Sequence, residues 1–123
     1  MVGLLALAGL AVDGGAALAA RHRAVTEARG AARAGAAALA TSQLRSAGMF
    51  IVDPAAAQTA ARAFLAQAGH PGDVLVTGDR VEVRVEFPVS TTFLGLVGLR
   101  EMRVEGRGLA RALHGVSAEE GSR

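Results

Sequence analysis

The first apolar segment of the chain is almost uninterrupted over residues 2–20, where Asp13 is the only charged side chain. As a helix, these 19 residues would span about 28 Å, close to the ~30 Å thickness of the hydrocarbon core of a bilayer. No basic residue precedes the segment. The segment also does not end in a cleavage site of small residues that is followed by a change in composition. We therefore favour a membrane anchor over a signal peptide.

The group Asp13, Gly14 and Gly15 is expected to mark the outer end of this anchor. A carboxylate at the middle of a membrane costs ~2.5 to 3.5 kcal/mol on insertion scales, and much less near the interface. We therefore expect further apolar residues upstream of Met1 to complete the span.

A helical pattern without proline continues from Ala16 to about Ala47, which predicts one long helix. One face carries mostly small residues, which allow another backbone to approach closely, while arginines lie on a second face. We call the first face the small-residue stripe. It could pack on the sheet of its own domain or on a helix of another subunit. Its members are Val25, Ala28, Ala32, Gly35, Ala36 and Leu39.

A second helix is predicted over residues 54–68. Asp53 is a favourable N-cap, Pro54 suits the first helical position, and Gly69 is a typical stop. The positions that this helix is expected to turn towards the core are Ala57, Ala60, Ala61, Phe64, Leu65 and Ala68.

Two alternating runs then flank Gly78 and Asp79, which predicts a β-hairpin with a two-residue turn. The turn sets the register and places the valines on one face and the charged residues on the other. Pro88 is expected to close the second strand. The predicted opposing pairs are Thr77 with Arg80, Val76 with Val81, and Val74 with Val83.

The residues after the hairpin predict a short helical piece and a third strand. Residues 90–99 are apolar and open with hydroxyl residues, which favours one or two helical turns. The next run alternates again and should pair with the hairpin. Its inward positions are Met102, Val104, Gly106, Gly108, Ala110 and Ala112.

These elements predict an α+β protein. A long N-terminal membrane-anchoring helix continues into a domain with a second helix and a small three-stranded antiparallel sheet. The predicted parts are an anchor at 1–20, a domain at 21–113, and a disordered tail at 114–123, where the chain becomes polar and loses its period.

The side chains nominate no catalytic, cofactor-binding or metal site. The absence of cysteine excludes disulfides, cysteine-ligated metals and a thiol nucleophile. His22, His70 and His114 have no metal-ligand spacing. The glutamates of the strands alternate with arginine, as on an exposed strand face. We therefore expect a protein that is not an enzyme, and the sequence identifies no small-molecule substrate.

Nucleic-acid binding is not expected either. All 13 basic residues other than histidine are arginine, yet the formal net charge is only +2, because glutamates and aspartates are interspersed with them. Tyrosine and tryptophan, which stack on bases, are absent.

The order of these features resembles the TadE/TadG-like proteins of bacterial tight-adherence (Flp-type) pilus assembly. The likeness covers nearly the whole chain except the tail, and the order is more specific than any single motif. The segments that carry it are the apolar helix ending in Val12-Asp13-Gly14-Gly15, residues 27–36, residues 52–57, the alternating hairpin, and residues 91–98 before the last strand.

The resemblance implies a minor pilin or pseudopilin-like component of the bacterial cell membrane. It would have one membrane-spanning helix and an extracytoplasmic pilin-like domain. Its partners would be pilin-like subunits and pilus-assembly membrane proteins, contacted laterally through the anchor and the small-residue stripe.

Two alternatives stay open. Arg21 and Arg23 follow the apolar segment, and the positive-inside rule alone would place the domain in the cytoplasm. The rival function is a membrane-tethered extracytoplasmic binding module that captures a ligand or envelope polymer on its sheet.

Overall fold

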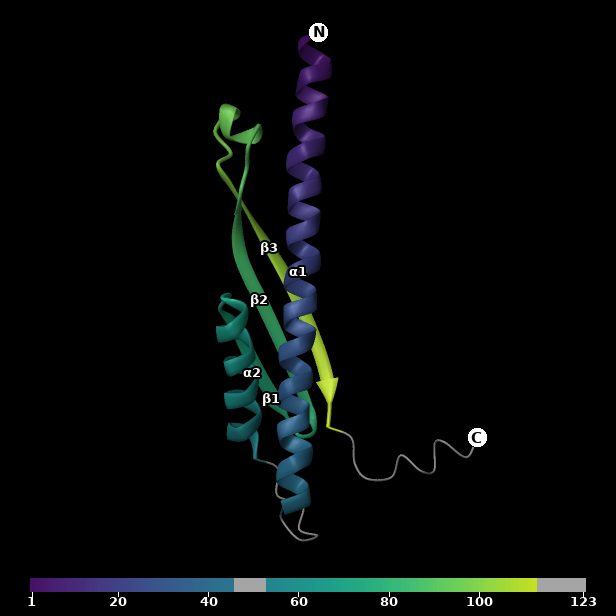
Figure 1. Ribbon diagram of the computed structural model, residues 1–123, viewed down its shortest axis with the longest axis vertical. Coiled ribbons are helices and arrows are strands. Elements are labelled where there is room, and N and C mark those ends of the chain that lie inside the picture. The colour runs from purple at the N-terminus through teal and green to yellow at the C-terminus, as the bar shows by residue number, and fades with distance from the viewer. Residues whose placement is uncertain (46–52, 113–123) are drawn as a thin grey trace, which may run out of the picture.

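The computed structural model describes residues 1–45 and 53–112 and has the predicted α+β architecture. The strands form one antiparallel sheet in the order β1-β2-β3. Both helices lie on one face of this sheet, and α1 runs the length of the molecule (Figure 1). The predicted tail at 114–123 lies outside the described residues. The elements are α1 (Val2–Arg45), α2 (Pro54–Ala68), β1 (Gly72–Thr77), β2 (Arg80–Ser90), the 3-10 helix η1 (Leu94–Val97) and β3 (Glu101–Arg111).

The ends of α2 are set by the residues that predicted them. Asp53 Oδ1 accepts the backbone N–H groups of Ala55 and Ala56 at 3.1 and 3.2 Å. Gly69 adopts φ 81°, a left-handed conformation that ends the helix and favours glycine. The predicted bounds of this helix are confirmed.

The hairpin has the predicted register, with Val76 opposite Val81 and Val74 opposite Val83. The expectation that Pro88 closes the second strand was wrong, since β2 continues to Ser90. β1 pairs only with residues 80–85, so β2 has an unpaired edge beyond them. Proline is tolerated there because no neighbouring strand needs its missing N–H.

The core is built by bringing α1 very close to β3. Ala24 and Ala28 are fully buried, and the predicted inward glycines Gly106 and Gly108 lie directly beneath them. A Cβ at Gly106 would collide with the backbone of Ala24, and one at Gly108 with that of Ala28. Glycine is therefore required here by close backbone approach. The largest fully buried hydrophobic side chains are Leu39, Val81, Val83 and Val85.

Candidate functional site

The small-residue stripe packs within its own chain. Of its members only Val25 keeps partial exposure, and the others are buried. A Cβ at Gly35 would lie 3.0 Å from the Val81 side chain and 3.1 Å from the carbonyl oxygen of Ala57, so both the sheet and α2 approach the stripe. Of the two partners considered for this stripe, the structure shows the intramolecular one. Little surface is left there for a helix of another subunit.

The buried side of α1 continues upstream of the predicted stripe. Three- and four-residue intervals keep its members on one side of the helix. This continuation was not predicted from the sequence. A signal for it was present, since Asp13 stands four residues after Gly9 and four before Ala17 on that side. The upstream members are Gly9, Asp13, Ala17, Ala20 and Ala24.

Asp13 connects α1 to the loop between β2 and β3. Its side chain is only 2% exposed. Oδ1 accepts the N–H of Thr92 at 2.8 Å, and Oδ2 accepts those of Phe93 and Leu94 at 2.9 and 2.6 Å. These N–H groups open η1 and have no partner within that helix. A buried carboxylate is costly unless it is hydrogen-bonded, and here both of its oxygens are.

The glycines on either side of Asp13 in the sequence have different surroundings: Gly9 faces the loop, whereas Gly14 and Gly15 face open space. A Cβ at Gly9 would lie 2.8 Å from the Cβ of Phe93, so the glycine lets the loop approach α1 closely. Added methyl groups at Gly14 and Gly15 would meet nothing within 4 Å. The role of Asp13, Gly14 and Gly15 as the outer end of a membrane anchor stays a prediction.

The N-terminal end of α1 is apolar and exposed. Of residues 2–12, all but Gly9 are exposed, and Leu4 and Leu7 keep 71% and 65% of their surface. In the described part of the chain, α1 is the one helix long and apolar enough to cross a membrane. The exposure of this end distinguishes it from the core helix of a soluble domain, whose apolar residues are buried.

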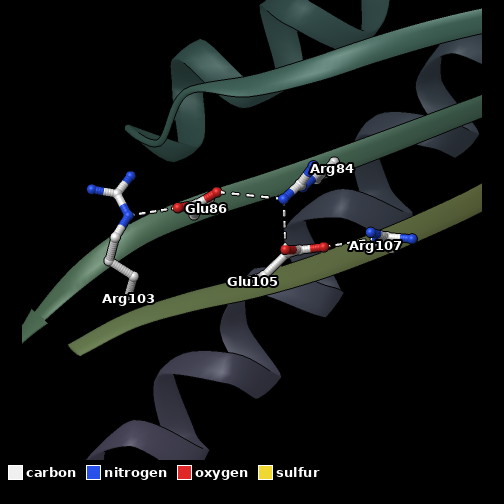
Figure 2. Close-up of polar contacts among 5 residues, drawn as sticks. All are labelled: Arg84, Glu86, Arg103, Glu105 and Arg107. Atoms are coloured by element: carbon white, nitrogen blue, oxygen red, sulfur yellow. Dashed lines mark hydrogen bonds and ion pairs between the residues drawn. The ribbon is translucent and has the colours of Figure 1, made fainter.

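The outer face of the sheet carries a ladder of ion pairs (Figure 2). Opposite positions hold like charges, with Arg84 facing Arg107 and Glu86 facing Glu105. The pairs therefore form along and across the strands: Arg84 to Glu105 at 2.9 Å, Arg107 to Glu105 at 2.7 Å, and Arg103 to Glu86 at 2.5 Å. The predicted charged face is confirmed, and many of its charges are matched within the sheet.

These contacts shift the ionisation of the ladder. The hydrogen bond from Arg107 holds the pKa of Glu105 below its ordinary value, and Arg84 adds to this effect. The same bond raises the pKa of Arg107. Both shifts favour the charged forms, as expected for opposite charges in contact.

An open groove of about 760 Å³ runs between α1 and β3. Arg21 and Arg29 line it from the helix, and Arg103 and Arg107 from the strand, together with Glu105. The groove could attract an anionic group. Its two strand arginines, however, already pair with glutamates of the ladder.

His70 joins the start of β1 to α1. Its Nδ1 lies 2.7 Å from Glu27 Oε2, and its ring stacks on Phe87 with centroids 4.0 Å apart. Within residues 1–45 and 53–112, no three His, Cys, Asp or Glu residues are grouped to hold a metal ion. The contacts of His70 tie the turn before β1 to α1 and to Phe87 of β2.

Three features of the described chain bear on function: the exposed apolar end of α1, the loop held by Asp13, and the open charged face of the sheet. No protein-family model, curated protein or solved structure matches the chain. The resemblance to TadE/TadG-like proteins therefore stays a prediction.

Proposed function

We propose that this chain is a membrane-anchored structural subunit of the minor-pilin or pseudopilin kind, acting in a tight-adherence (Flp-type) pilus or the related secretion apparatus. One observation carries the proposal. A single continuous helix, α1, packs on the domain with its downstream part, while residues 2–12 form an uncharged apolar segment that is exposed except at Gly9 (Figure 1).

The exposed apolar segment accounts for anchoring. Moving apolar surface out of water contributes roughly 25 cal/mol of favourable free energy per Å². Large leucine side chains are exposed in this segment. A bilayer or neighbouring apolar helices would cover them. A helix built this way joins a membrane-embedded end rigidly to an attached domain.

Lateral contact with other subunits is assigned to this projecting segment. The small-residue stripe is buried against the sheet and α2, so we do not assign the lateral contact to it. The projecting segment also contains small residues, Gly3, Ala6 and Ala8, which permit close helix packing in membranes. The family resemblance supplies the kind of partner: pilin-like subunits and pilus-assembly membrane proteins.

Site-specific cross-linking tests the proposal. A photoreactive side chain at Leu7, on the projecting segment, is expected to cross-link to co-expressed pilin-like subunits. The matched control is Leu75, another exposed leucine, which lies on the outer face of the sheet and should give no such product. Release of the chain from membranes by alkaline carbonate, together with no product from Leu7, would contradict the proposal.

Orientation is tested with a single cysteine at Leu75, since the chain has no cysteine of its own. We propose an extracytoplasmic domain, so a membrane-impermeant maleimide should label intact cells. Labelling only after lysis would instead support the cytoplasmic placement that Arg21 and Arg23 indicate.

The rival function, a tethered binding module, is favoured by the groove between α1 and β3. Its arginines suit an anionic envelope polymer. Arg21→Gln should then weaken binding to such a polymer while leaving cross-linking from Leu7 unchanged. If Arg21→Gln changes neither polymer binding nor cross-linking from Leu7, the structural role is favoured.

A further inference from the structure

We propose that the loop between β2 and β3, residues 91–100, is a second membrane-inserting element that enters the bilayer beside α1. We call it the 91–100 loop. The inference rests on the proposed anchoring of α1 and adds a second point of contact, which would fix how the domain stands on the membrane.

The loop presents large apolar side chains to its surroundings. Leu96 is 83% exposed and Val97 77%, with Leu99 at 56% and Phe93 at 44%. The chain carries no charge from Phe87 through Leu99. Connections at a water-exposed surface are usually polar, and a contiguous apolar patch marks an interaction surface.

The bilayer is the occupant indicated, because this patch is continuous with the apolar end of α1. The loop lies at the N-terminal end of the molecule, alongside α1 (Figure 1). Phe93 packs against Gly9, and Asp13 binds the loop backbone. Whatever medium surrounds residues 2–12 therefore reaches the loop as well.

The backbone of the loop is hydrogen-bonded in a way that suits an apolar medium. Unsatisfied N–H groups are costly in lipid. Thr91 N–H bonds to the Arg100 carbonyl at 2.9 Å, and Leu99 N–H to that of Leu94 at 3.0 Å. Asp13 accepts the N–H groups of residues 92–94. The same bonds stabilise the Asp13 carboxylate, which lowers the cost of placing its charge at the membrane boundary.

The nearest positive charges limit the depth of insertion. Arg100 follows Leu99 directly, and Arg21 lies roughly 12 Å beyond Asp13 along the helix. Arginines at this level would reach lipid phosphates with their guanidinium groups. The loop would therefore occupy only the outer part of one leaflet.

Single tryptophans test the inference, because the chain has none. Leu96→Trp reports on the loop, Leu5→Trp on α1, and Leu75→Trp on the outer face of the sheet. All replace exposed leucines, so the fold should tolerate them. In vesicles of phosphatidylcholine and phosphatidylglycerol with brominated chains, we expect L96W and L5W to lose most of their emission and L75W to keep it.

The other outcomes separate this inference from the proposed function. Quenching of L5W alone would overturn loop insertion and leave the anchor standing, whereas quenching of neither would overturn both. A blue-shifted L96W emission without quenching would show that protein, a second copy or a partner, covers the loop, and would also overturn the inference.

The positioning role of Asp13 has its own test. In Asp13→Asn the quenching of L96W should fall while that of L5W persists, because the loop is no longer held beside α1. The matched control is Asp53→Asn, which also alters a carboxylate that accepts backbone N–H groups, far from this end. Unchanged L96W quenching in Asp13→Asn would overturn this role.

Discussion

Ala24 of α1 packs directly onto Gly106 of β3, so helix and strand backbones meet with no side chain between them. One turn further along, Ala28 repeats the contact with Gly108. These two contacts set the distance between α1 and the sheet. They also direct the projecting end of the helix past the loop that Asp13 holds.

Replacing Gly106 with alanine should lower the free energy of unfolding by about 2 kcal/mol, since the added methyl group would collide with helix backbone, which cannot move aside easily. Chemical denaturation in detergent measures the change. Gly14→Ala is the matched control: its methyl group meets nothing within 4 Å, and alanine is favoured over glycine in a helix by about 1 kcal/mol. Equal stability of wild type and G106A would contradict the close contact.

Replacing Ala32 with leucine should destabilise the domain itself by about 1–3 kcal/mol, because Ala32 is fully buried within the chain. Ala37→Leu, on the exposed side of α1, should change stability little. Thermal melting of both variants measures these changes in stability. If A32L melts like the wild type but no longer co-purifies with pilin-like subunits, the stripe is an intermolecular surface after all.

Glu105 should contribute stability that depends on pH. Because contact with Arg107 and Arg84 lowers its pKa in the folded state, the contribution is present above the pKa of the unfolded chain. It is lost as the pH falls through the lowered folded value. Melting temperatures from neutral to strongly acidic pH should therefore show wild type above Glu105→Gln at neutral pH and the two converging in acid. A constant difference across this range would contradict the assignment.

The contact between His70 and Glu27 should appear as a coupling energy. A double-mutant cycle with His70→Ala and Glu27→Ala is expected to give roughly 1 kcal/mol, the usual contribution of a partly buried hydrogen bond. Denaturant titration of the single and double variants supplies the cycle. Strictly additive effects would show that the 2.7 Å contact adds nothing to stability.

Much of the fold could be predicted because its signals are local. Asp53 and Gly69 end α2 through contacts within a few residues, and the Gly78-Asp79 turn sets the hairpin register by itself. Period-two alternation also placed Gly106 and Gly108 on the buried face of β3. These features require no knowledge of the remaining chain.

The rest depended on distant partners. The N–H groups that Asp13 binds lie about 80 residues further along the chain, and nothing near Asp13 points to them. The continuation of β2 past Pro88 depends on where β1 ends. The composition of the small-residue stripe predicts that a backbone packs on it, but not which one.

Residues 2–12 of α1 are proposed to lie in a membrane while the same helix, further along, packs on its own sheet. Spin-label accessibility at a single cysteine replacing Leu7, in vesicles, tests it most directly. High accessibility to oxygen with low accessibility to a water-soluble nickel complex, the reverse of a label at Leu75, is the predicted result. A label at Leu7 as accessible to nickel as the one at Leu75 would contradict the account.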